Sequence, residues 1–154
     1  MKRHPALLAL SREHHSALSL SLAARRAIQA GPAEIRAVAG RALACYRDEL
    51  RPHFAVEEDV LLPALVAAGG SGNAALVART LDEHRQLHEL AAALDGPSPD
   101  GEALRRFGEL LGDHVRFEER ELFEAAQAFG VADALAAAEL DSGASRIART
   151  CRMA

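Results

Sequence analysis

The sequence has few aromatic residues and only two cysteines. Aromatic side chains make up 4% of its 154 residues and tryptophan is missing, while alanine and leucine supply most of a 49% hydrophobic content. Cys45 and Cys151 stand far apart and outside any CxxC pair, so neither a disulfide framework nor a thiolate zinc site is expected. Because alanine and leucine are strong helix formers, the composition favours an all-helical protein.

The sequence also lacks long apolar runs and an excess of basic residues. No apolar stretch reaches the ~20 residues that a membrane-spanning helix needs. The apolar run after the basic start of the chain is broken at once by Ser11, Arg12 and Glu13, so no signal-peptide core is expected there. The formal net charge is -4, with both signs interspersed, so there is no basic surface to bind phosphates. We therefore expect a cytoplasmic protein that binds neither membranes nor nucleic acid.

The spacing of apolar residues predicts four long helices. We expect them at residues 5–29, 33–68, 71–94 and 102–129. Gly31-Pro32, Gly69-Gly70 and the segment DGPSPDG at 95–101 separate these helices. Inside the second helix Pro52 removes a backbone donor, so we expect a kink just before His53.

Short loops between long amphipathic helices favour one architecture. A short loop leaves no length for a crossover, so we expect an antiparallel up-down four-helix bundle. The chain length suits a single domain over residues 1–154. Its core should span about residues 5–130, and the extension 131–154 should form a short C-terminal helix or a tail.

Six of the seven histidines lie within the predicted helices, and each helix carries at least one on an apolar face. His14 shares its face with Leu10, Leu18 and Leu22, and His84 shares its face with Leu81, Leu87 and His88. At ~1.5 Å rise per residue, counting from the loops places His84 nearly level with His53 and His114, whereas His14 matches less closely. The four helices should therefore bring imidazoles to one layer of the core.

Two glutamates follow histidines at a spacing that brings them to the same layer. In HFAVEE from His53 and HVRFEE from His114, residues four apart share a helix face, which selects Glu57 and Glu118. Five steps rotate by ~140°, so Glu119 is kept only as an alternative to Glu118. Imidazoles and carboxylates that converge in an apolar bundle indicate a pair of metal ions, and nitrogen and oxygen donors without thiolates suit iron or manganese, with zinc as a lesser alternative.

The motifs occur in a specific order along the chain. They read EHH at Glu13 to His15, HFAVEE from His53, EHRQLH from Glu83 and HVRFEE from His114. This order resembles the hemerythrin-like family of HHE cation-binding domains over about residues 5–130. It includes a weak internal repeat, REHH with HFAVEE and then DEHR with HVRFEE. The oxygen carriers of that family differ in the last motif, where an aspartate follows the histidine after five steps.

The resemblance implies a centre of two iron ions joined by an oxo or hydroxo bridge. One iron would be held by three imidazoles and the other by two, with two bridging carboxylates; the implied ligands are His14, His53, Glu57, His84, His88, His114 and Glu118. The unequal sets leave an open position where dioxygen, peroxide or another small ligand could bind. The resemblance thus implies oxygen or redox sensing, storage or iron handling rather than an enzyme, and no residue is required as a catalytic acid or nucleophile.

Alternatives to this hypothesis stay open at the level of sequence. One is a di-iron oxidoreductase, such as a peroxidase or a nitric oxide response factor, and another is a metal-free helical interaction module. A mononuclear or zinc-loaded site is a fourth hypothesis. Among single residues, His15 stands ~100° around the helix from His14 and suits the edge of the site. Tyr46 either packs in the core or donates to a site ligand.

Overall fold

The computed structural model describes residues 2–142, and these are almost entirely helical. Its α-helices are α1 (Pro5–Ala30), α2 (Pro32–Cys45), α3 (Arg51–Val56), α4 (Leu62–Ala68), α5 (Asn73–Ala93), α6 (Gly101–Phe117), α7 (Phe123–Ala128) and α8 (Ala132–Ser142). No strand occurs in this part of the chain, so the all-α prediction is confirmed. None of the described helices is both long and apolar enough to cross a bilayer.

Three wider, π-helical turns connect some of these helices without a break. They are η1 (Tyr46–Leu50), η2 (Glu57–Leu61) and η3 (Glu118–Leu122). As a result α2, α3 and α4 form one continuous run, and α6 and α7 form another. The predicted helix boundaries therefore hold to within about two residues at each end of the four runs.

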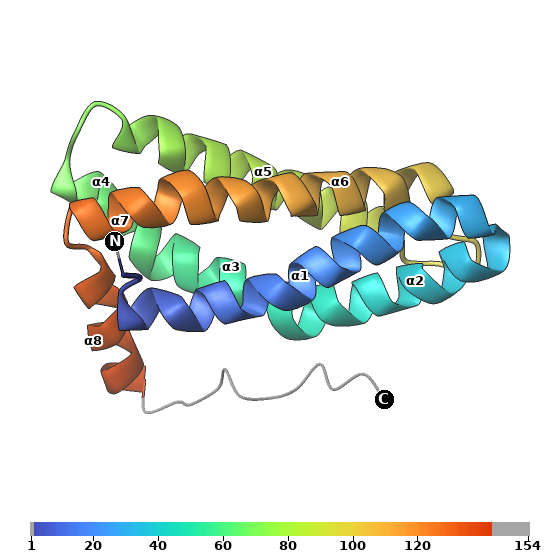
Figure 1. The fold of residues 1–154 in the computed structure, drawn as a ribbon, viewed down its shortest axis with the longest axis horizontal. Coiled ribbons are helices and arrows are strands. Elements are labelled where there is room, and N and C mark those ends of the chain that lie inside the picture. Colours follow the sequence, from blue (N-terminus) through green and yellow to red (C-terminus); the bar gives the residue numbers. More distant parts are fainter. Residues whose placement is uncertain (1, 143–154) are drawn as a thin grey trace.

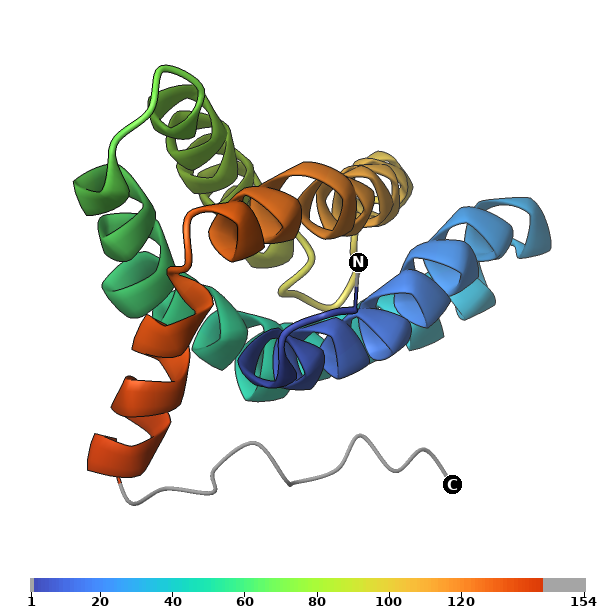
Figure 2. The same ribbon diagram turned by 60° about the vertical axis from the view of Figure 1, so that its left-hand side comes forward.

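The four runs lie side by side and alternate in direction along the chain. In Figure 1 the chain passes along α1, returns from α2 to α4, passes out again along α5 and returns along α6 and α7. The helix α8 then turns away and lies across the end of the molecule at which α1 begins (Figure 2). The short helix expected within the extension 131–154 is thus α8, and the predicted tail lies outside the described residues.

The prolines of the second run account for both of its π-helical turns. Pro52 and Pro63 have no N–H, so each leaves one carbonyl of the preceding turn without its usual partner. In the structure the residue before each proline bonds five residues back, Arg51 to the Tyr46 carbonyl and Leu62 to the Glu57 carbonyl. Where a kink was expected before His53, the structure has a π-helical turn from Tyr46 to Leu50. The turn η3 contains no proline.

The apolar core consists of two separate clusters. The larger one fills the end near the α1–α2 turn and includes Leu87, Phe107 and Leu111. The other fills the opposite end and includes Leu7, Leu61 and Phe123, with α8 packed against it. Between these clusters lies a layer of buried polar side chains, which includes four of the five histidines expected to face inward.

The inward face of α1 differs from the one predicted. Leu18 and Leu22 are exposed, and Ala17, Ser21 and Ala24 take the inward positions beyond His14. Successive steps of four residues each advance ~40° too far, so the face that starts at Leu10 turns outward by Leu22. On α5 Leu81 is likewise exposed. Beyond His14, most residues of the buried face of α1 are therefore small.

These small residues let α1 and α6 approach each other closely. The Ser21 hydroxyl donates to the Gly108 carbonyl at 2.6 Å. A Cβ added at Gly108 would lie 2.7 Å from the Ala24 Cβ, and one at Gly112 would lie 2.6 Å from the Ser21 Oγ. Since α1 carries His14 and α6 carries His114, this contact helps to set the distance between two sides of the polar layer.

We expect Gly108→Ala to destabilise the protein by ~1–3 kcal/mol, because the new methyl group would meet the Ala24 Cβ and the Ser21 carbonyl. The matched control is Gly40→Ala in the exposed middle of α2, where nothing lies within 4 Å of an added Cβ. That change should stabilise the helix by roughly 0.5–1 kcal/mol. Denaturant unfolding measures both changes, and an equal response of the two variants would contradict the close approach.

Candidate metal centre

Six ionisable side chains meet in the polar layer between the two apolar clusters. They come from all four helical runs and are 4% exposed or less: His14, His53, Glu57, His84, His114 and Glu118. Glu57 and Glu118 are completely buried, and each is the first residue of a π-helical turn. The layer expected from helix periodicity is therefore present.

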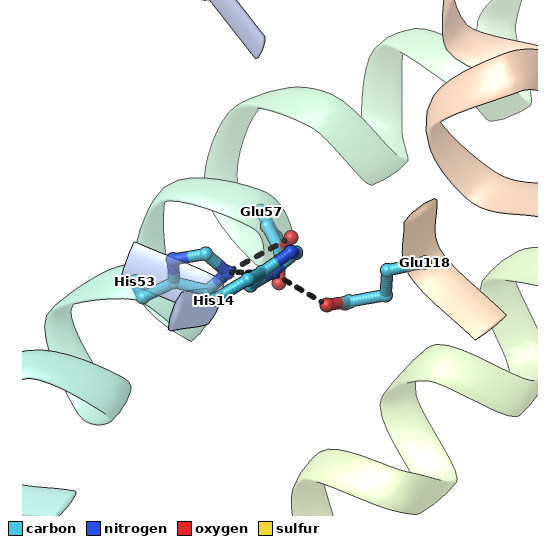
Figure 3. A group of neighbouring side chains, drawn as sticks. All are labelled: His14, His53, Glu57 and Glu118. Atoms are coloured by element: carbon cyan, nitrogen blue, oxygen red, sulfur yellow. Dashed lines mark hydrogen bonds and ion pairs between the residues drawn. The ribbon is translucent and has the colours of Figure 1, made fainter. Parts of the chain in front are cut away.

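The six side chains divide into two groups that share both glutamates. One group consists of His14, His53, Glu57 and Glu118, and Figure 3 shows these side chains directed toward one another. The other consists of Glu57, His84, His114 and Glu118. In each group the four potential ligand atoms lie within 4.8 Å of one another, which is compact enough for a metal ion to touch all of them.

Each shared carboxylate directs one oxygen toward each group. Glu57 places Oε1 at 3.3 Å from the His53 Nε2 and Oε2 at 3.3 Å from the His84 Nε2. Glu118 places Oε2 at 3.1 Å from the His14 Nε2 and Oε1 at 3.1 Å from the His114 Nε2. Both glutamates therefore have the orientation that a carboxylate needs to bridge two ions.

The polar atoms of this layer are not satisfied by the protein alone. Both oxygens of Glu57 and of Glu118, and the Nε2 atoms of His84 and His114, are buried without a hydrogen bond of good geometry. The Nε2 atoms of His14 and His53 face each other at 3.3 Å, which is unfavourable unless a proton or a cation lies between them. Because unpaired buried polar groups cost free energy, this donor set fits a bound cation.

Each of the four histidines of the layer, called the inner histidines, is bonded through its Nδ1 to a further glutamate. We call these four glutamates the outer carboxylates. The Nδ1 atoms bond to glutamate oxygens at 2.6–2.7 Å, in the pairs His14–Glu119, His53–Glu13, His84–Glu58 and His114–Glu83. An ionised carboxylate can only accept, so the proton of each neutral imidazole must lie on Nδ1. Its Nε2 then carries the lone pair that a metal ion requires.

These outer pairs follow the internal repeat of the sequence. The glutamate before each EH histidine bonds the other histidine of its own repeat, as Glu13 does with His53. The second glutamate of each EE pair bonds the EH histidine of the other repeat, as Glu58 does with His84. The roles of Glu13 and Glu83 were not predicted, although the repeated Glu-His dipeptide is their signal. Glu119, kept as an alternative to Glu118, belongs to this outer set.

His88 is the one predicted ligand that belongs to neither group. It is exposed, and its Nδ1 is bonded to the Tyr46 hydroxyl at 2.6 Å. A protonated phenol can donate to Nδ1, which would leave the proton on Nε2 and remove the lone pair there. Each of the two groups thus contains two imidazoles, and a third imidazole ligand from His88 stays a prediction. Tyr46 packs in the larger apolar cluster, which was one of its two expected roles. His15 is exposed.

Two phenylalanines pack flat against inner histidines. Phe54 stacks on His84 with 3.9 Å between ring centroids, and Phe123 stacks on His14 at 5.4 Å. Phe54 also meets the His114 ring edge-on at 5.5 Å. These contacts restrict rotation of the imidazoles and keep the layer between apolar walls.

Burial and the glutamates act in opposite directions on the histidine pKa values. Burial alone would lower the pKa of His84, but the neighbouring carboxylates of Glu118 and Glu57 outweigh burial and raise that pKa to about 9. Burial would also lower the pKa of His114, but the charge of Glu118 outweighs burial and raises that pKa to about 10. For His53 burial is outweighed by the charge of Glu57, and the pKa is well above its ordinary value.

The two shared glutamates show the complementary effect. Burial favours the neutral form of Glu118, but the charge of the neighbouring His114 outweighs burial and holds the pKa of Glu118 well below its ordinary value. At Glu57 burial and the charge of Glu118 both oppose ionisation, yet His53 and His84 lower the pKa. Without metal, the layer is therefore stabilised as an array of protonated imidazoles and carboxylates.

A comparison with protein families agrees with this geometry. The family model for the hemerythrin HHE cation binding domain matches residues 6–126. The chain belongs to the hemerythrin HHE cation-binding family. Comparisons with curated proteins and with solved structures returned no match. As a hemerythrin HHE domain the chain binds metal cations, and its two buried groups of histidines and glutamates are able to hold them.

The placement of His88 predicts a contrast between two histidines on the same helix, one turn apart. His88→Gln should leave the metal content unchanged, whereas His84→Gln should lower the affinity for at least one ion by more than about tenfold, because only His84 directs Nε2 into the layer. Metal analysis after dialysis against a weak chelator measures both. A loss of metal in His88→Gln equal to that in His84→Gln would restore the set of five imidazoles.

The raised histidine pKa values predict how stability depends on pH in metal-free protein. Their stabilisation is complete below the unfolded value of ~6.5 and is lost as pH rises through about 9 and about 10. Between about pH 8 and pH 10.5 the melting temperature of chelator-treated protein should fall by ~5 °C or more. Metal-loaded protein should fall less, because metal replaces the proton on Nε2. Parallel melting curves for the two forms would contradict this assignment.

Proposed function

We propose that the chain binds two iron ions in the polar layer and that the pair binds dioxygen or a similar small ligand, such as peroxide. The observation that supports this proposal most directly is the division of each shared carboxylate between two groups of imidazoles. Two carboxylates offset part of the charge of two cations, which a cage of histidines alone would not do. The chemistry of such a pair is oxidation and reduction at iron.

The donor atoms support iron over the other metals considered. The inner layer offers imidazole nitrogens and carboxylate oxygens, and neither group contains a thiolate or thioether. Such a donor set suits iron and manganese, admits zinc and disfavours copper(I). The proposed ligands are His14, His53, Glu57, His84, His114 and Glu118, with Glu57 and Glu118 bridging.

The equal sets of imidazoles change the expected place of ligand binding. Two nitrogens and two oxygens supply four donors for each ion, fewer than the about six that octahedral iron takes. Positions for an external ligand therefore stay open at both ions and not at one alone. The apolar walls formed by Phe54 and Phe123 suit a small, uncharged ligand such as dioxygen.

A di-iron oxidoreductase is the second candidate function. The equal number of imidazoles in the two groups favours it. Unequal ligation was the reason to expect reversible binding at a single ion, and that inequality is not present in the two groups. A peroxidase or a nitric oxide response factor would use open positions at both ions. The two candidates share their ligands and differ in turnover.

Some features of the proposal rest on the sequence and the fold together. We propose that the four alternating runs act as an antiparallel up-down four-helix bundle, with ligands supplied from each run. The cytoplasmic location stays a prediction, as does the expectation that nucleic acid and membranes are not partners. The oxo or hydroxo bridge also stays a prediction.

The proposal predicts two iron ions per chain after anaerobic loading with Fe(II), and a ligand-to-iron charge-transfer band after exposure to air. The matched variant is Glu118→Gln, in which a neutral amide replaces the carboxylate that both groups share. This change should lower iron retention by more than about tenfold. Metal analysis and optical spectra of both proteins provide the measurement.

The outcomes of this experiment separate the functions. A stable spectrum that reverses when oxygen is removed supports ligand binding, and catalytic consumption of peroxide without a stable spectrum supports the oxidoreductase. Wild-type protein that retains no iron and shows no band would contradict both. A melting temperature that is indifferent to iron and chelator would favour the metal-free interaction module.

A further inference from the structure

Two arginines contact the outer carboxylates of the polar layer, one on each side. Arg3, which precedes α1, donates from Nη2 to the Glu119 Oε2 at 2.8 Å. Arg79 on α5 donates from Nε to the Glu83 Oε1 at 2.7 Å. In both cases the other carboxylate oxygen accepts from an inner imidazole, that of His14 or that of His114, at 2.7 Å.

Arg3 holds its carboxylate through several contacts at once. Besides the Glu119 side chain it bonds the Glu119 carbonyl at 2.9 Å and the Glu124 Oε1 at 3.1 Å. Its guanidinium also lies over the ring of Phe123, at 5.6 Å from the centroid. Phe123 stacks on His14, and Glu119 bonds its Nδ1. Arg3 therefore contacts both side chains that fix the orientation of this imidazole.

Arg79 makes the corresponding arrangement on the other side. Its guanidinium lies over the ring of Phe117 at 3.8 Å, and its Nη1 is 3.7 Å from the Glu121 Oε1. The bond to Glu83 spans one helical turn, so the helix itself supports it. Among residues 2–142, no ion pair with arginine or lysine is seen at the other two outer carboxylates, Glu13 and Glu58.

An anchored carboxylate differs physically from a free one. A glutamate bound at a single oxygen can rotate about its side chain, whereas a carboxylate bound at both oxygens has its plane fixed. The imidazole that donates to it is then fixed as well, and a metal ligand fixed in advance loses less conformational entropy on binding. In each group of the layer, one histidine has this support and the other lacks it.

We propose that Arg3 and Arg79 are positioning residues, each of which supports one of the two metal positions through a glutamate and a histidine. Arg3 acts through Glu119 on His14, and Arg79 acts through Glu83 on His114. This inference rests on the proposed function, because it concerns the affinity of the same two positions. It adds that residues outside the ligand set adjust the two ions separately.

The test is a titration of metal-free full-length chain with Co(II) against a competing chelator. Arg3→Gln and Arg79→Gln should each weaken one of the two binding steps about tenfold and leave the other within about twofold. The matched control is Arg85→Gln, since Arg85 pairs with Asp82 and Glu89 on the surface of α5 and contacts no imidazole. That variant should bind like the wild type.

Two histidine variants assign each arginine to its position. His14→Gln should leave only the position at His84 and His114, so that Arg79→Gln weakens Co(II) binding in this background and Arg3→Gln does not. In the His114→Gln background the effects should be exchanged. Arg3→Lys keeps the charge without the planar fork and should give an intermediate affinity, with a matching intermediate shift of the Co(II) visible bands.

The outcomes distinguish this inference from the proposed function. If the wild type binds two Co(II) ions while the arginine variants behave like Arg85→Gln, the positioning role is overturned and the metal centre stands. Equal weakening of both steps, or the same response in both histidine backgrounds, would show general destabilisation and also overturn it. A wild type that binds no ion would overturn the proposed function itself.

Discussion

Two carboxylates buried side by side impose the main constraint on this structure. Glu57 and Glu118 are completely buried, and each opposes ionisation of the other. Four imidazoles offset that repulsion, and every one of them is in turn held by a carboxylate nearer the surface. Charge of alternating sign therefore extends from the buried centre outward to the partly exposed glutamates, between the two apolar clusters.

The backbone makes this arrangement feasible by departing from regular α-helix at the glutamates. Glu57 and Glu118 each start a π-helical turn, which holds one residue more than an α-helical turn. Consecutive glutamates can then act on the two nitrogens of one imidazole: Glu118 faces the His14 Nε2 from within the layer, while Glu119 bonds the His14 Nδ1 from outside it. Small residues on α1 opposite Gly108 and Gly112 complete the geometry by letting the helices approach.

Sequence reasoning predicted the elements and the inner layer, because both follow from spacing along one helix. Four-residue steps identified Glu57 and Glu118, and loop residues marked the helix ends. What sequence reasoning missed depends on several turns of one helix or on a second helix. Leu18 and Leu22 are exposed because the periodicity drifts over several turns, and the bond between Tyr46 and His88 joins two helices, so no spacing along α5 reveals it. The partners of Glu13 and Glu83 depend in the same way on how neighbouring helices are rotated.

The internal repeat explains why the two halves of the centre are alike, and it also locates where they differ. Each repeat supplies one EH histidine, one HxxxE histidine and one shared glutamate, so the inner donors of the two groups are equal in kind and number. The surroundings are not equal. Phe54 lies against His84 and His114, whereas Phe123 lies against His14. The arginine behind His114 is Arg79 on α5, whereas the one behind His14 is Arg3, which precedes α1. If each group holds an ion, as proposed, any functional difference between the two ions must therefore arise outside these inner donors, in the residues that orient the imidazoles and limit access to them.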